Sequence, residues 1–201
     1  MRLETILDYL FPAACVACGA ISSAICDTCL PPPEAIQRFT LGPLRVVALG
    51  TYDGALRRAI LALKRGRRDV GVALANALRQ RFAAELQPCR VLVPVPTTAA
   101  RRAERGFDQA ALLARELERS SGLAVLEILL QTAGDAQRGR SRTARLGARG
   151  RFRCSAAVAR GLEIVLLDDV ATTGATLRDC RAVLESAGAR VTGGIVLART
   201  L

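Results

Sequence analysis

The segment from Ile164 to Thr176 constrains the fold of this chain more than any other, because it joins an apolar run to two adjacent acids and a small polar turn. Ile164 to Leu167 are large aliphatic residues, a pattern typical of a strand that is covered on both faces. Asp168 and Asp169 follow directly. Ligands of open α/β sheets bind at the carboxyl ends of the strands, so we expect a polar ligand site here.

The polar turn after the two acids has the composition of a phosphate-binding loop. Gly174 can adopt a positive φ angle and so let the backbone approach a ligand closely. Apolar residues then recur at helical spacing as far as Gly188, the expected C-cap, so the turn leads into the amino end of a helix. A phosphate there would meet free N–H groups, threonine hydroxyls and the positive end of the helix dipole. The residues expected to bind it are Ala171, Thr172, Thr173, Gly174, Ala175 and Thr176.

The two acids, Asp168 and Asp169, would repel a phosphate, so their expected partners are vicinal hydroxyls or a hard cation. A ribose 5-phosphate satisfies both the acids and the loop. The combination resembles the signature of the type I phosphoribosyltransferases, which implies that the acids hold the ribose 2- and 3-hydroxyls while the loop holds the 5-phosphate. A less favoured interpretation is a Rossmann-like strand, loop and helix in which the acids are incidental.

Strand and helix patterns alternate through the rest of the chain, which favours a mostly parallel sheet flanked by helices. Apolar runs predict strands over 44–52 and 90–95, and helical periodicity predicts helices over 54–64, 70–86 and 101–119.

The strand over 90–95 is also followed by residues suited to ligand binding, first hydroxyls and then the arginine-rich start of a helix. We expect Thr97 and Thr98, with Arg102 or Arg105, to bind a pyrophosphate group. The alternative is that one of the two arginines is a surface charge of the helix.

Residues 94–109 indicate a particular family within the type I phosphoribosyltransferase-like proteins. Pro94-Val-Pro96 and Glu104-Arg-Gly-Phe-Asp-Gln109 are similar to signatures of the ComF family of phosphoribosyltransferase-like proteins, and residues 137–152 and the amino-terminal cysteines fit the same pattern. The resemblance implies a type I phosphoribosyltransferase fold, a donor bound with Mg²⁺, and involvement in DNA uptake without an assigned acceptor. The chain departs from the pattern at three positions, Asp108, Arg140 and Ala148, where the family has asparagine, leucine and asparagine.

Four of the seven cysteines form two Cys-x-x-Cys pairs near the amino terminus. Two such pairs close together in the sequence predict one structural Zn²⁺ site with four thiolate ligands, Cys15, Cys18, Cys26 and Cys29. Disulfides are the less favoured alternative, because a chain without an export signal stays in a reducing compartment. The other three cysteines, Cys89, Cys154 and Cys180, are expected to be small buried hydrophobes.

Histidine is absent, which excludes Ser-His-Asp and Cys-His catalysis and histidine-based metal sites. Phosphoribosyl transfer passes, as the resemblance implies, through a ribosyl cation and depends on placed charges instead.

Basic residues crowd the stretch 137–153, and the net charge of the chain is +11. We expect this stretch to be a mobile hood, with Arg142 and Arg145 facing the site, because related transferases close an arginine-bearing loop to exclude water. A plain solvated loop is the alternative. The charge also suits nucleic acid, although 3% aromatic residues and no tryptophan leave few stacking platforms for single strands.

We therefore expect an amino-terminal helix and zinc module over 1–33 and a phosphoribosyltransferase domain over 40–201. The favoured function is a phosphoribosyltransferase-like protein that binds phosphoribosyl pyrophosphate; the alternative is a non-catalytic ligand-sensing or nucleic-acid-associated module. No apolar run approaches the roughly 20 residues of a membrane span, and acids interrupt the amino terminus, so a cytoplasmic location is expected. DNA-uptake proteins and nucleic acid are candidate partners, and a homo-oligomer is compatible with the sequence.

Overall fold

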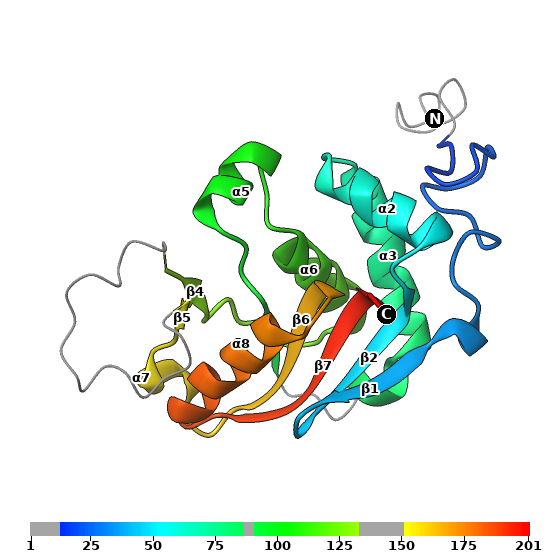
Figure 1. Ribbon diagram of the computed structural model, residues 1–201. Helices are drawn as coiled ribbons and strands as arrows, with labels where there is room; N and C mark the ends of the chain where they lie inside the picture. The colour runs from blue at the N-terminus through cyan, green and yellow to red at the C-terminus, as the bar shows by residue number, and fades with distance from the viewer. Residues whose placement is uncertain (1–12, 87–90, 133–150) are drawn as a thin grey trace.

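The computed structural model describes residues 13–86, 91–132 and 151–201, and a five-stranded sheet forms its centre (Figure 1). The strands lie in the order β1-β2-β7-β6-β3. The first pair is antiparallel and the other three pairings are parallel, which confirms the expected mostly parallel sheet. The strands are β1 (Gln37–Leu41), β2 (Leu44–Thr51), β3 (Val91–Pro94), β6 (Glu163–Ala171) and β7 (Arg190–Arg199).

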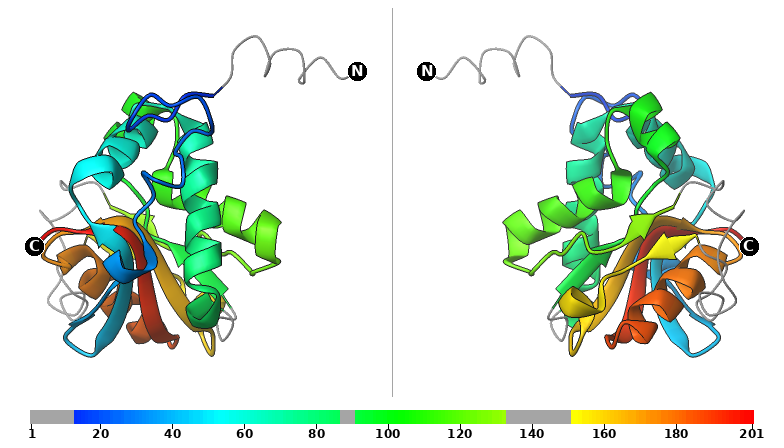
Figure 2. Two further views of the ribbon diagram at one scale, coloured as in Figure 1. Left: turned by 90° about the vertical axis from the view of Figure 1, so that its right-hand side faces the viewer. Right: turned by 90° about the vertical axis from the view of Figure 1, so that its left-hand side faces the viewer.

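Helices cover both faces of the sheet, because successive side chains of each strand point to opposite faces and most of them are apolar. Val165 and Leu167 of β6 pack in the same cluster as α2, α3 and α6, whereas Ile164 and Leu166 pack with α8. Figure 2 shows α3 and α6 on one side of the sheet and α8 on the other. The four helices are α2 (Gly54–Lys64), α3 (Arg68–Arg81), α6 (Gln109–Ser121) and α8 (Ala175–Ser186).

Two predicted helices are each divided in the structure. The helix expected over 70–86 stops at the fully buried Phe82, and a short helix, α4 (Ala83–Leu86), follows. The helix expected over 101–119 is α5 (Ala99–Arg105) followed by α6. Gly106 ends α5 with a φ of 76°, and the Asp108 carboxylate begins α6 by accepting a hydrogen bond from the Ala111 N–H. A left-handed glycine and an acidic N-cap together interrupt the periodicity.

The strand predicted over Ile164–Leu167 is longer than expected, because β6 pairs with β7 as far as Ala171. Asp168 and Asp169 therefore lie inside the strand, as its sixth and seventh residues, rather than after its end. Their backbone is fixed by the sheet, which holds the two carboxylates more rigidly than a loop would.

The amino-terminal cysteine segment packs against the sheet's helical layer. Cys15, Ile25 and Cys26 are buried in the same apolar cluster as residues of α2 and α3. Pro31 lies against Gly50 of β2, and the short 3₁₀ helix η1 (Pro33–Ala35) leads into β1. The amino-terminal helix expected over residues 1–10 lies outside the described residues.

Three small elements complete the described chain. β4 (Leu130–Gln131) pairs antiparallel with β5 (Phe152–Arg153), and α7 (Ala156–Ala159) precedes β6. The two short strands bracket residues 133–150 in the sequence. Among the helices that the structure describes, none combines the length and apolarity needed to cross a membrane.

Candidate functional site

A cleft of about 620 Å³ lies at the carboxyl ends of β3 and β6. Lys64 of α2 and Arg105 of α5 both line it, and these helices flank this edge of the sheet in Figure 1. Its polar lining is rich in hydroxyls and charges: Tyr52, Lys64, Thr97, Thr98, Arg101, Arg105, Asp108, Gln109, Gln131, Arg151, Asp168, Asp169, Thr172, Thr176 and Thr200. The carboxyl edge of the sheet is where open α/β folds bind ligands.

The predicted acidic pair lines this cleft, and one of its members is already paired. The Lys64 ammonium lies 2.8 Å from Oδ2 of Asp169, and the two side chains are 23% and 19% exposed. Oδ1 of Asp168 accepts a hydrogen bond of 2.8 Å from the Asp169 N–H. The sole lysine of the chain therefore supplies a positive charge at the expected ribose-binding position.

The two carboxylates lie in different electrostatic environments. Burial and then the negative charge of Asp169 raise the pKa of Asp168 well above its usual range, with a smaller effect in the same direction from Asp108. The Asp169 N–H and the Lys64 charge oppose this rise only in part. A cation or sugar hydroxyls beside Asp168 would stabilise its ionised form and lower that pKa.

The predicted phosphate loop connects β6 to α8 as expected. Gly174 has a φ of 70° and is the N-cap residue of α8. The backbone angle favours glycine, and a Cβ atom there would lie 2.4 Å from the end of the Leu41 side chain of β1, which would have to move. Thr172 and Thr176 line the cleft, and the Thr173 hydroxyl accepts a hydrogen bond from the Ala175 N–H.

The segment after β3 and the helix α5 supply most of the cleft residues predicted to bind pyrophosphate. Thr97 and Thr98 line the cleft, and the Thr98 hydroxyl caps α5 by accepting from the Arg101 N–H. Arg105 also lines it and donates to Oε1 of Gln109 at 2.8 Å. Arg102 instead points to an adjoining hollow of about 380 Å³, where it lies 3.4 Å from Oδ2 of Asp108.

Asp108, one of the departures from the family pattern, supports the Thr97 turn. Its Oδ2 accepts from the Thr97 N–H at 2.7 Å while its Oδ1 caps α6. A carboxylate has two acceptor oxygens, whereas an asparagine side chain has one, so aspartate can hold the turn and the helix together.

Eight polar residues of the cleft were not predicted as site residues from the sequence: Tyr52, Lys64, Arg101, Asp108, Gln109, Gln131, Arg151 and Thr200. Lys64 is the only lysine of the chain and also matches a lysine position of the ComF pattern, but its acidic partner is remote in the sequence. The predicted hood arginines, Arg142 and Arg145, lie outside the described residues.

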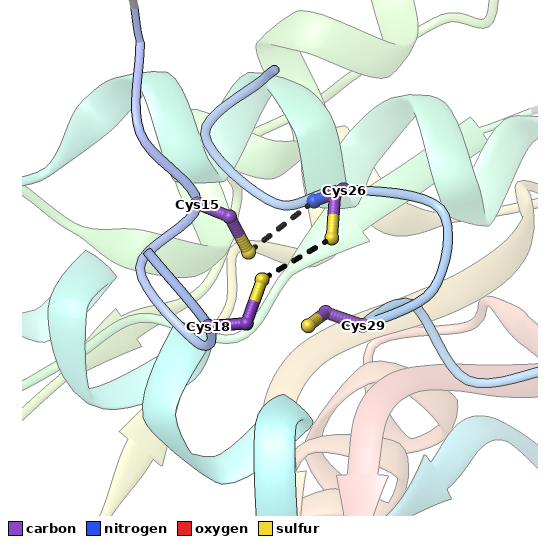
Figure 3. A group of neighbouring side chains, drawn as sticks. All are labelled: Cys15, Cys18, Cys26 and Cys29. Atoms are coloured by element: carbon purple, nitrogen blue, oxygen red, sulfur yellow. Dashed lines mark hydrogen bonds between the residues drawn. The ribbon is translucent and has the colours of Figure 1, made fainter. Parts of the chain in front are cut away.

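The four predicted metal-binding cysteines converge. Their Sγ atoms all lie within 4.8 Å of one another, and Figure 3 shows the four side chains pointing into one space. The Cys18 and Cys26 Sγ atoms are 3.6 Å apart, close to the roughly 3.7 Å expected between ligands of tetrahedral Zn²⁺ with Zn–S bonds of about 2.3 Å. All four thiols are free, so the cluster can hold a metal such as zinc, and the disulfide alternative is not what the structure shows.

The pKa values of two of these thiols, Cys15 and Cys29, are shifted in opposite directions. Burial raises the pKa of Cys15, but N–H groups from Cys26, Ala17 and Cys18 outweigh it and lower the value to about 6. A hydrogen bond with the Cys18 thiol, followed by burial, raises the pKa of Cys29 to about 12. Metal binding would deprotonate the ligands, so it must release protons from this cluster.

Comparison with known proteins gives the family. "Competence protein ComFC" of Bacillus subtilis is 32% identical over 154 residues, which are 75% of this chain and 62% of that protein, less than two thirds of its length. "DNA utilization protein YhgH" of Salmonella typhimurium is 32% identical over 199 residues, which are 93% of this chain and 84% of that protein. The chain belongs to the ComF family.

This ComF-family chain matches no model in a scan of protein families. Among solved structures, a glutamine phosphoribosylpyrophosphate amidotransferase of B. subtilis is 23% identical, with a TM-score of 0.47 over 67% of this chain and 26% of that one. Likeness at this level is weak, so membership of the ComF family rests on the sequence relatives.

Proposed function

We propose that the cleft binds phosphoribosyl pyrophosphate together with Mg²⁺ and that the chain is a phosphoribosyltransferase-like protein. The arrangement of charge carries this proposal. Asp168, Asp169 and the cleft-lining threonines Thr172 and Thr176 come from β6 and its connection to α8, while Thr97, Thr98 and Arg105 come from the segment after β3 and from α5. Negative groups suit the ribose hydroxyls, and hydroxyls, N–H groups and guanidinium suit the two phosphate ends.

The two groups of residues then have separate roles in donor binding. Asp168 and Asp169 accept hydrogen bonds from the ribose 2- and 3-hydroxyls, and the start of α8 binds the 5-phosphate through N–H groups and threonine hydroxyls. The Lys64 ammonium neutralises Asp169 before the donor binds, and in the complex it is shared between that carboxylate and the donor. Asp108 keeps Thr97 and its N–H in place through the hydrogen bond at 2.7 Å.

The carboxylates of the cleft also fit the expected cation, because Mg²⁺ prefers oxygen ligands and commonly uses one or two carboxylates with substrate phosphates. Asp168 and Asp169 are the residues that would hold it beside the donor. When bound, Mg²⁺ neutralises the pyrophosphate and makes it a better leaving group. The residues of the chain orient the ribose and stabilise the positive charge that develops at its C1.

The names of the relatives support a role in competence or DNA utilisation, with an acceptor that is not assigned. A second candidate is a non-catalytic module that binds the same ligand as a signal. Exposed arginines, including Arg57, Arg58 and the cleft-lining Arg101, favour contact of such a module with nucleic acid. Turnover separates the two: a transferase releases pyrophosphate when an acceptor is present, whereas a sensor binds the donor and leaves it intact.

Thermal unfolding tests donor binding. Phosphoribosyl pyrophosphate with Mg²⁺ at about 100 times its dissociation constant should stabilise the fold by about 2.7 kcal/mol and raise the melting temperature by several degrees, roughly 5–11 °C. Adenosine monophosphate with Mg²⁺, which carries a ribose 5-phosphate but no pyrophosphate, is the matched ligand and should give a smaller rise. An unchanged melting temperature with the donor would contradict the proposal.

A further inference from the structure

Arg151 lines the cleft, but the proposed function gives it no role beside the acidic pair, the threonine loop and the residues expected to bind pyrophosphate. It immediately precedes β5, and its carbonyl accepts a hydrogen bond of 2.8 Å from the Thr132 N–H. The next residue, Phe152, is 4% exposed and packs in the apolar cluster of α8. The backbone of Arg151 is therefore fixed from two directions, which limits where its side chain can reach.

The Arg151 side chain reaches across to the first turns of α8. Its Nη2 donates to the Thr176 hydroxyl at 3.2 Å, and its Nε lies 3.4 Å from Oδ2 of Asp179. The Asp179 side chain is 13% exposed, so the guanidinium is anchored on a mostly buried carboxylate. Arg151 thus connects the β4–β5 pair to the expected phosphate loop.

The guanidinium retains donors for a ligand. Arginine has five N–H donors, and among the described residues only Thr176 and Asp179 accept from or pair with those of Arg151. Its side chain is 46% exposed and lines the cleft. The remaining N–H groups are therefore accessible to an anion bound beside the Thr176 hydroxyl.

We propose that Arg151 is a specificity-determining residue that binds the 5-phosphate of the donor from outside the threonine loop and so selects phosphorylated ribosyl ligands. The inference rests on the proposed function, because it assigns one more contact to the same ligand. A guanidinium binds phosphate through directional, charge-assisted hydrogen bonds. Asp179 orients the guanidinium, so it acts as a positioning residue and does not itself touch the phosphate.

Binding of separate donor fragments tests this assignment. The Arg151→Ala variant should bind ribose 5-phosphate and phosphoribosyl pyrophosphate about ten-fold to a hundred-fold more weakly, while its affinity for pyrophosphate with Mg²⁺ stays within about two-fold. Arg151→Lys should recover part of the loss, because lysine keeps the charge but lacks the fork of donors. Arg153 is an exposed arginine of β5, two residues further on, that does not line the cleft, so Arg153→Ala is the matched control and should bind like wild type.

The outcomes separate this inference from the function on which it rests. Wild-type protein that binds neither phosphoribosyl pyrophosphate nor ribose 5-phosphate contradicts the proposed function itself. If the wild-type protein binds ribose 5-phosphate and Arg151→Ala binds it with the same affinity, the role of Arg151 is overturned while the proposed function stands. Equal losses for ribose 5-phosphate and pyrophosphate would also overturn it, since they indicate a general loss of charge or of fold. A melting temperature of Arg151→Ala that matches those of wild type and Arg153→Ala excludes misfolding as the cause of its weaker binding.

Discussion

At the scale of single residues, the pairing of Lys64 with Asp169 sets the chemistry of the cleft. Two adjacent carboxylates repel each other, and the Lys64 ammonium 2.8 Å from Oδ2 of Asp169 places a positive charge beside that member. Asp168 has no such partner at its own oxygen; it accepts only the Asp169 N–H among the described residues. Burial, followed by the negative charge of Asp169, raises the pKa of Asp168, so proton binding at Asp168 competes with binding of the donor.

Donor affinity should therefore increase with pH. Asp168 must be ionised to accept from the ribose hydroxyls or to approach Mg²⁺, and its pKa is raised in the free protein. Affinity should rise as pH increases through that raised value and then level off, with protons released on binding below it. Isothermal titration in buffers of different ionisation enthalpy measures this release. Asp168→Asn should remove the pH dependence, and an unchanged profile in that variant would contradict the assignment.

The Asp168 carboxylate should also make the stability of the free protein depend on pH, and stability should decrease where donor affinity increases. The unfolded chain ionises Asp168 near pH 4, whereas the folded chain keeps its proton to higher pH. The folded state then binds more protons between these two values, so the Asp168 contribution to the free energy of unfolding decreases as pH rises across this window. Comparing wild type with Asp168→Asn by chemical denaturation isolates that contribution.

At the scale of elements, the connection from β6 to α8 depends on Gly174. Replacing it with alanine places a Cβ 2.4 Å from Leu41 and forces a non-glycine residue to a φ of 70°. We expect the free energy of unfolding to fall by about 1–3 kcal/mol, with weaker binding of the 5-phosphate because the loop must move. Equilibrium unfolding and ribose 5-phosphate binding measure the two effects.

Gly193→Ala is the matched control for that substitution. Gly193 lies in β7 without a positive φ, and an added Cβ would come no closer than 3.5 Å to another atom, the Arg45 carbonyl oxygen. Its effect on stability should be within about 1 kcal/mol. Equal destabilisation by the two substitutions would contradict the specific requirement at Gly174.

The sequence predicted those helices and strands that one continuous apolar or helical pattern defines. The apolar run Ile164–Leu167 and the glycine of the following turn predicted the β6–α8 unit, and helical periodicity predicted α2 with its observed ends, Gly54 and Lys64. Periodicity failed where the interruption was local, because Gly106 and Asp108 end one helix and begin another within a continuous helical pattern. Lys64 and Arg151 could not be assigned from the sequence, since only the fold brings them to Asp169 and Thr176.

At the scale of the whole molecule, the cysteine module and the α/β sheet share one buried cluster. Cys15 and Cys26 are 3% and 7% exposed and contribute to the same apolar layer as α2 and α3. Because α2 ends at Lys64, the module packs on the helix that carries the positive charge of the cleft. Metal binding at the cysteines is therefore expected to stabilise the whole fold and not only the amino-terminal segment.

Loss of the metal should lower the melting temperature of the entire chain. Cys15→Ser or Cys26→Ser should reduce zinc content from about one ion per chain and lower the melting temperature by about 5 °C or more. Cys154→Ser, a partly buried cysteine outside the cluster, is the control and should keep both values. Elemental analysis and calorimetric melting provide the readouts. Zinc content well below one ion per chain in the wild-type protein would contradict the predicted zinc site.

The central claim is that the cleft binds a phosphoribosyl pyrophosphate donor through its acidic pair, and isothermal titration calorimetry with Mg²⁺ tests it most directly. Wild-type protein should show saturable binding with one donor per chain. The Asp168→Asn, Asp169→Asn double variant should bind at least about a hundred-fold more weakly, whereas Asp27→Asn, an exposed aspartate outside the cleft, should bind as wild type does. Absence of binding to the wild-type protein, or equal affinity in the double variant, would contradict the claim.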